Sequence, residues 1–190
     1  LTALARARRI LSNVRRQLRR RRLMEPATHF SYDELVDAIH DNDLASIKRL
    51  ENKYGPALLR MDDDPEQITS LNHAAAAGHA DLVLYLLAPP INANPRAAHG
   101  NKFTPLHAAS MHGHALIIQT LIQSGADVNA QTDPQLYAPL HSAAFAGHID
   151  AIKVLLQNGA DISRQNYRNE TPAATAMRTG KLDAYKLLSE

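Results

Sequence analysis

The densest group of histidines in this sequence has side chains that could bind a metal ion or transfer protons. His107, His112 and His114 lie within TPLHAASMHGH, residues 104–114, and imidazole is a common zinc ligand and general base. Helical zinc pairs are usually four residues apart with a third ligand nearby, whereas His112 and His114 are two apart and flank Gly113. No acidic residue lies within this string. We therefore expect no metal site and no cofactor.

Other residue patterns that support catalysis are equally sparse. The chain has no Cys, which excludes disulfides, CxxC zinc sites and thiol nucleophiles. It has no GxSxG, no HExxH and no glycine-rich phosphate loop. Asp62, Asp63 and Asp64 could attract a divalent cation, but they lack EF-hand spacing and a distal glutamate, which favours a solvated turn. We expect a protein that is not an enzyme.

The histidine string is one copy of an internal repeat, and a second copy, APLHSAAFAGH, occupies residues 138–148. Aligned starts recur at steps of 35, 34 and 33, at Thr69, Thr104, Ala138 and Thr171. A glycine follows nine residues after each start, at Gly78, Gly113, Gly147 and Gly180. After the first three of these glycines come apolar pairs spaced as on one face of a helix. Each unit should therefore hold two helices.

The recurring residues suit a helix, a tight turn and a second helix. Proline at the first turn of a helix loses no hydrogen bond, and a preceding threonine can cap the free N–H groups. The alanine pairs, such as Ala108-Ala109 and Ala143-Ala144, allow neighbouring helices to approach closely. Glycine can end the first helix in a left-handed conformation.

These units resemble ankyrin repeats, whose signature is T-P-L-H-x-A with a period of about 33 residues. The resemblance covers about residues 31–190 and implies an all-α solenoid of about five helix-turn-helix units with hairpin-like loops. We expect an ankyrin-repeat domain over 27–190, with atypical first and last units and with units at about 31–65, 66–100, 101–134, 135–167 and 168–190. The resemblance also implies that His107 and His141 form hydrogen bonds to the backbone of adjacent units. We interpret His79, His114 and His148 as structural.

The resemblance further implies a concave binding face built from first helices and loops. The predicted partner-binding residues on it are Met111, His112, Tyr137, Phe145, Arg164, Tyr167, Arg168 and Arg178. The alignment also places Ala108 and Thr175 on this face. Met111 and Phe145 would form a hydrophobic spot flanked by arginines, suited to a partner segment with apolar anchors and acidic flanks. Alternatively, Phe145 turns inward and packs between units.

Residues 1–26 form a different kind of segment, a basic amphipathic helical arm that ends at Pro26. Leu4, Ala7, Leu11, Val14 and Leu18 make one apolar stripe. The residues predicted to bind nucleic acid or an anionic surface are Arg6, Arg8, Arg9, Arg15, Arg16, Arg19, Arg20, Arg21 and Arg22. Residues 1–24 hold nine arginines and no acid, whereas residues 25–190 hold 12 basic and 19 acidic residues, a net charge of −7. The arm could bind RNA or DNA, lie on an anionic membrane, act as a targeting element, or pack on another helix.

Together these features predict a non-enzymatic protein–protein interaction module or scaffold. Its groove would bind a protein partner, and its arm would anchor it to a larger assembly. The alternatives are a structural subunit of a ribonucleoprotein complex, with residues 1–22 on RNA or another polyanion, and a regulatory region of a larger enzyme. No apolar run approaches the roughly 18 residues of a transmembrane segment. We expect an intracellular, cytoplasmic location, with mitochondrial or nuclear targeting through the arginine-rich segment as alternatives.

Overall fold

The computed structural model describes residues 31–60, 69–89 and 102–190. The predicted arm over 1–26 lies outside the described residues. The chain divides after Tyr32, and the unit that follows, Asp33–Glu190, carries the repeats. None of the helices in the described ranges has both the length and the apolar character that a membrane crossing requires.

Among the described residues, ten helices make five consecutive pairs, as the sequence predicts. The pairs are α2 (Tyr32–His40) with α3 (Leu44–Tyr54), α5 (Ser70–Ala77) with α6 (Ala80–Leu87), α7 (Pro105–His112) with α8 (Ala115–Gln123), α9 (Pro139–Ala146) with α10 (Ile149–Gln157), and α11 (Pro172–Arg178) with α12 (Leu182–Ser189). A short extra helix, α4 (Ala57–Arg60), follows the first pair and was not predicted.

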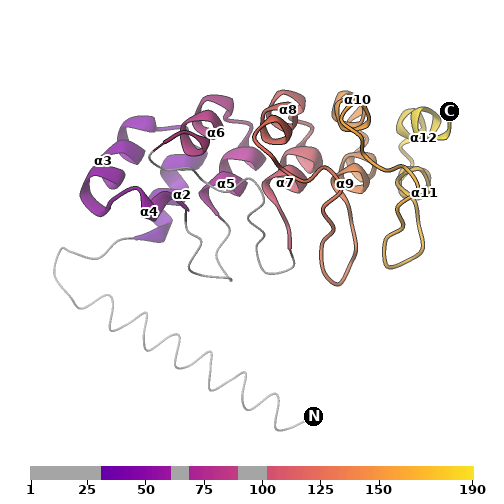
Figure 1. Ribbon diagram of the computed structural model, residues 1–190, viewed down its shortest axis with the longest axis horizontal. Helices are drawn as coiled ribbons and strands as arrows, with labels where there is room; N and C mark the ends of the chain where they lie inside the picture. Colours follow the sequence, from indigo (N-terminus) through magenta and orange to yellow (C-terminus); the bar gives the residue numbers. More distant parts are fainter. Residues whose placement is uncertain (1–30, 61–68, 90–101) are drawn as a thin grey trace, which may run out of the picture. The chain divides into compact units, whose positions relative to one another are not determined.

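The helix pairs stack side by side in two rows (Figure 1). In one row α5 packs on α7, α7 on α9 and α9 on α11; in the other, α8 lies between α6 and α10. The loops before α9 and α11 extend away from the helices on one side (Figure 1). This arrangement confirms the expected all-α ankyrin-type solenoid.

The first helix of each later unit begins where the repeat predicts. The threonine side chains accept a hydrogen bond from the backbone N–H three residues on in α5, α7 and α11, at Thr69, Thr104 and Thr171. Proline occupies the first turn of α7, α9 and α11. Ala138 has no side-chain oxygen to cap α9, and its own N–H donates to His141 Nδ1 at 3.2 Å.

Left-handed residues separate the two helices of a unit. Gly78, Gly113 and Gly147 have φ of 83°, 78° and 84°, and Asn42 takes their place in the first unit with φ 54°. Glycine is also required for space, because a Cβ on Gly113 would lie 2.7 Å from the His148 ring of the next unit. The turn therefore fixes both the chain direction and the distance between units.

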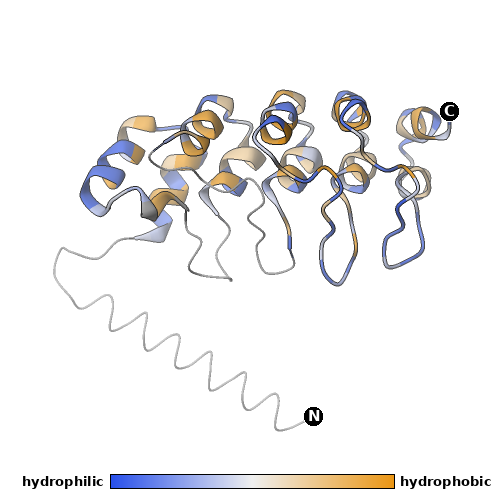
Figure 2. Cartoon of the chain, viewed as in Figure 1, coloured by the Kyte–Doolittle hydropathy of each residue, from blue (hydrophilic) through white to orange (hydrophobic). Residues whose placement is uncertain are grey.

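The core lies between the two rows and between neighbouring units. The alanine pairs of α7 and α9 are at most 3% exposed, and Ile117, Ile118 and Leu121 of α8 are at most 2% exposed. Burying each such large side chain stabilises the fold by about 1.5–3 kcal/mol. Figure 2 shows the hydrophobic residues concentrated on the helices, whereas the loop before α11 is mostly hydrophilic.

Candidate functional site

Two units are each tied to the loop that follows them by one buried histidine. His107 Nε2 donates to the Tyr137 carbonyl oxygen at 2.9 Å, and His141 Nε2 donates to the Glu170 carbonyl oxygen at 3.0 Å. On the other side of the ring, His107 Nδ1 accepts the Thr104 N–H at 3.2 Å. These bonds confirm the role that the resemblance implied.

Asn72 stands where the repeat calls for the same histidine, and it makes the same kind of bond. Its Nδ2 donates to the Phe103 carbonyl oxygen at 3.0 Å, and its backbone N–H donates to Thr69 Oγ1. An amide therefore supplies the inter-unit link in the second unit.

A second set of histidines reaches back to the preceding unit. His79, His114 and His148 stand at the N-termini of α6, α8 and α10, where their side chains make no capping bond. Their Nε2 atoms lie 2.9, 3.0 and 3.1 Å from backbone carbonyl oxygens, those of His40, Ala76 and Met111. These rings are thus structural, as the repeat predicted.

Burial favours the neutral form of His107 and His141. Desolvation lowers the pKa of His107 to about 4, against weaker opposing hydrogen bonds from its surroundings. The pKa of His141 is also lowered, chiefly by burial. A neutral ring with hydrogen on Nε2 fits both the acceptor at Nδ1 and the carbonyl at Nε2. Within the described ranges, no group of three His, Cys, Asp or Glu side chains is arranged to hold a metal ion.

Between α7, α9 and the loops before them lies a hollow of about 290 Å³, which we call the α7–α9 hollow. It is lined by Phe103, Met111, Thr132, Gln135, Tyr137, His141, Ser142 and Phe145. The structure thus brings together three of the predicted partner-binding residues, Met111, Tyr137 and Phe145. Phe145 is 44% exposed, so the alternative that it packs inward between units is wrong.

The repeat geometry positions the walls of this hollow. Met111 and Phe145 are the penultimate residues of α7 and α9, one repeat apart. Three wall residues have their carbonyl oxygens held by the inter-unit links: Phe103 by Asn72, Tyr137 by His107, and Met111 by His148. The same bonds that stack the units therefore fix the shape of the hollow.

Sequence reasoning missed three lining residues, Phe103, Thr132 and Gln135. Phe103 directly precedes the capping Thr104, a position whose side chain the repeat motif does not specify. Gln135 lies in the loop before α9 and carries no motif at all. The only signal for Phe103 was its aromatic side chain beside a helix start. The sequence offered no signal for Thr132 or Gln135.

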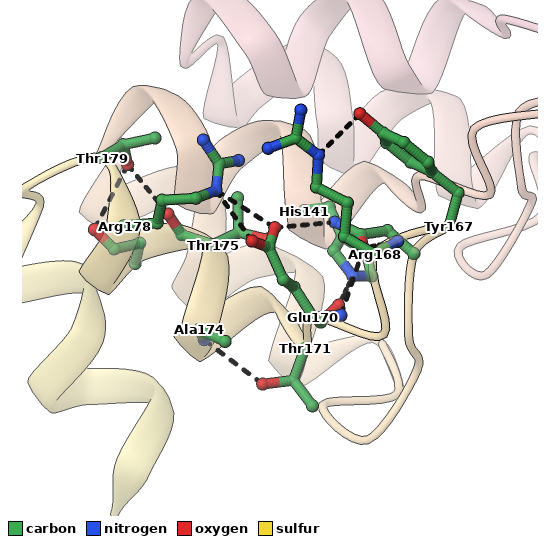
Figure 3. A network of polar contacts seen from close by, with 11 residues as sticks. His141, Tyr167, Arg168, Glu170, Thr171, Ala174, Thr175, Arg178 and Thr179 are labelled. Carbon is green, nitrogen blue, oxygen red and sulfur yellow. Dashed lines mark hydrogen bonds and ion pairs between the residues drawn. The ribbon is translucent and has the colours of Figure 1, made fainter.

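Aromatic and cationic side chains continue beyond the hollow along the next loop. The Tyr137 ring meets that of Tyr167 edge-on, with centroids 6.2 Å apart. The Arg168 guanidinium lies 5.2 Å from the Tyr167 ring centroid, and its Nε donates to the Tyr167 hydroxyl at 2.6 Å (Figure 3). This loop thus presents a stacked tyrosine–arginine surface.

The other two arginines of the predicted site already have acidic partners. Arg178 Nε lies 2.9 Å from Glu170 Oε1 (Figure 3). Burial alone would raise the pKa of Glu170, but hydrogen bonds from Asn166 and Arg178 outweigh it, and the net pKa is lowered. Arg164 donates to Gln131 at 2.9 Å and lies 3.8 Å from Asp161. The cationic flank is therefore largely neutralised by the protein's own carboxylates.

The remaining predicted positions lie apart from the hollow. His112 is exposed at the end of α7 and stacks on His114, with ring centroids 6.2 Å apart. Ala108 and Thr175, which the alignment placed on the binding face, are 3% and 0% exposed. That placement is wrong because both side chains are buried and offer no surface to a partner.

Comparison with known proteins agrees with this architecture. The family model described as ankyrin repeats (three copies) matches residues 35–132, 71–166 and 131–190. The chain therefore belongs to the ankyrin repeat family, whose repeats are generic protein–protein interaction modules.

Curated proteins that resemble this chain match it over only a small part of their own length. They include a probable E3 ubiquitin-protein ligase, XBOS32, of Oryza sativa (34% identity over 99 residues), rabankyrin-5 of Mus musculus (36% over 92 residues) and palmitoyltransferase AKR1 of Lachancea kluyveri (34% over 100 residues). The matches cover 52%, 45% and 52% of this chain but only 19%, 8% and 13% of those proteins.

Proposed function

We propose that the chain is a non-enzymatic interaction module that binds a segment of a partner protein at the α7–α9 hollow. The observation that carries this proposal is the half-exposed Phe145, which shares an apolar hollow with Met111 and Tyr137. Large aromatic and thioether side chains are costly to leave in water and are enriched at the centres of protein interfaces. Because the backbone of three wall residues is already held by hydrogen bonds, binding a partner should cost little additional conformational entropy there.

A capture experiment with matched variants tests the proposal. The whole chain, Phe145→Ala and Leu116→Ala would be immobilised and exposed to extract. Leu116 is 70% exposed on α8 and does not line the hollow. Leu116→Ala therefore controls for the loss of a large exposed apolar side chain elsewhere on the surface. A partner that is retained by wild type and Leu116→Ala but lost with Phe145→Ala supports the hollow. A partner retained equally by all three would contradict it.

A second candidate function rests on charge. Nine arginines and no acid occur in residues 1–24, whereas the rest of the chain is acidic. Such an arm suits RNA or another polyanion, in a ribonucleoprotein subunit or at an anchoring surface. RNA retention that falls steeply with salt and disappears on deletion of residues 1–22 would support this role. RNA retention that persists after the deletion would contradict a role of residues 1–22 in RNA binding.

A third candidate is the regulatory region of a larger enzyme. It is supported by relatives whose names denote enzymes and in which the matched repeats are a small part of the protein. An antibody raised against residues 102–190 would test it. A native polypeptide far above 20.9 kDa is the expected result, and a band at that mass would contradict it.

A further inference from the structure

We infer that Leu136, in the loop before α9, is a further partner-binding residue that contacts an apolar side chain of the partner protein. This inference rests on the proposed function and extends the binding surface beyond the α7–α9 hollow. Leu136 itself is not a lining residue, but its two chain neighbours, Gln135 and Tyr137, are. The inference follows from the backbone conformation of Leu136, its exposure, and the hydrogen bonds that hold its loop.

The loops before α7, α9 and α11 make the same left-handed bend, two residues before the N-cap of each helix. Lys102, Leu136 and Asn169 occupy this position, with φ of 61°, 57° and 57°. Since the bend recurs with three different side chains, the fold requires the conformation and not a leucine. A left-handed backbone is unfavourable for residues with a Cβ, is tolerated best by asparagine and aspartate, and is unusual for a bulky residue. Asn169 therefore suits the bend, whereas Leu136 is strained.

Exposure is a second disadvantage of leucine at this bend. The Leu136 side chain is 42% exposed, and the residues at the two equivalent bends, Lys102 and Asn169, are exposed and polar. Asparagine at position 136 would satisfy both the backbone and the solvent. Strained residues are found preferentially where function uses them. A leucine that serves neither the turn nor solubility thus indicates a role in binding.

The loop holds Leu136 in a fixed place. Its N–H donates to the Thr132 carbonyl oxygen at 3.0 Å, and its carbonyl oxygen accepts from Gln131 Nε2 at 3.0 Å. The loop before α11 also holds the preceding residue, because the Tyr167 N–H donates to the Gln135 carbonyl oxygen at 3.0 Å. A side chain on a backbone fixed in this way can be contacted at little cost in conformational entropy.

The chemistry of leucine indicates the kind of partner. Leucine has no ring to stack on a base and no charge or donor for a phosphate, the contacts by which proteins hold single-stranded nucleic acids. The cation at the equivalent bend, Lys102, is paired with Asp133 at 3.2 Å. The complement is therefore an apolar side chain. We expect a protein segment with two apolar side chains, one for the hollow and one for Leu136.

The first part of the test measures stability, because a leucine kept for binding should be replaceable without loss to the fold. Leu136→Asn should raise the urea concentration at the midpoint of unfolding, since asparagine tolerates the left-handed backbone. The reciprocal variant Asn169→Leu, at the equivalent bend, should lower that midpoint. A lower midpoint for Leu136→Asn would overturn the inference, because the leucine would then serve the fold.

The second part measures binding with defined probes. Random peptides displayed on phage would be selected on the whole protein, and the selected peptides would be titrated by fluorescence anisotropy. We expect peptides with two apolar side chains that bind Phe145→Ala and Leu136→Asn at least about fivefold more weakly than wild type, the loss typical of an important interface residue. Leu116→Ala should bind them as wild type does.

The remaining outcomes separate this inference from the proposed function. Peptides that depend on Phe145 but bind Leu136→Asn as tightly as wild type would overturn the inference and leave the proposed function standing. An oligouridine RNA that binds Leu136→Asn more weakly than wild type would contradict a protein partner at Leu136. If no selected peptide depends on Phe145, the proposed function fails and the inference fails with it.

Discussion

At the scale of single residues, the inter-unit links show that position and hydrogen bonding matter more than residue type. His107 and Asn72 occupy equivalent places, and each donates to a carbonyl oxygen of the next loop. The imidazole differs in one respect, because it can be protonated. Protonation of His107 would place a hydrogen on Nδ1, which accepts the Thr104 N–H, and would charge a ring that is 0% exposed.

Stability should therefore depend on pH through His107. Its pKa is about 4 in the fold against 6.5 for the free side chain, so the unfolded chain binds the proton more tightly. The stabilisation is fully present above about pH 6.5, is lost as the pH falls toward 4, and changes no further below that. The loss is roughly 3 kcal/mol at most. Urea unfolding at a series of pH values measures it, and a flat profile between pH 4 and 6.5 would refute this prediction.

His107→Asn tests the cause directly, since Asn72 shows that an amide can make this link. We expect the variant to fold and to lose less stability than wild type as the pH falls from 6.5 to 4. His141 still titrates, so the slope should shrink and not vanish. His112→Asn, at an exposed position, should leave the wild-type slope unchanged. The same slope in His107→Asn and wild type would show that another group is responsible.

At the scale of helices and turns, glycine serves two purposes that substitution can separate. Gly113 and Gly125 both have positive φ, at 78° and 95°, so alanine costs about 1–2 kcal/mol of backbone strain at either. A Cβ on Gly113 would also meet the His148 ring, whereas one on Gly125 would meet nothing within 4 Å. We expect Gly113→Ala to be more destabilising by about a further 1–3 kcal/mol, measured by urea unfolding. Equal losses would mean that His148 moves aside without cost.

Helix capping offers a stabilising change at the same scale. Thr104 caps α7, but its counterpart Ala138 leaves α9 without a side-chain cap. The two positions are similarly buried, at 5% and 1% exposure, so threonine should fit at 138. Ala138→Thr should raise the free energy of unfolding by about 1 kcal/mol, and Thr104→Ala should lower it by a similar amount. A loss of stability in Ala138→Thr would indicate overpacking at the start of α9.

At the scale of the whole molecule, the sequence predicted the fold well because the fold is a repeat. The recurring start and the glycine turn located both helices of each later unit. The short helix α4 escaped prediction because it falls where the repeat imposes no pattern.

The candidate site was predicted only in part. Residues on the helices, such as Met111 and Phe145, could be placed because their positions are repeated. Gln135 could not, since its role depends on how a loop folds beside the next unit. The charge balance around Arg178 likewise depends on Glu170, eight residues earlier in sequence, and no local pattern reveals that pairing.

The central claim is that the repeated histidines hold neighbouring units together and so shape the hollow between α7 and α9. The most direct test is nitrogen-15 NMR of the His107 and His141 rings at pH 7, with and without zinc. The structure predicts neutral rings with hydrogen on Nε2, unchanged by the metal. Rings that carry hydrogen on Nδ1, that are charged, or that shift on zinc addition would contradict the account.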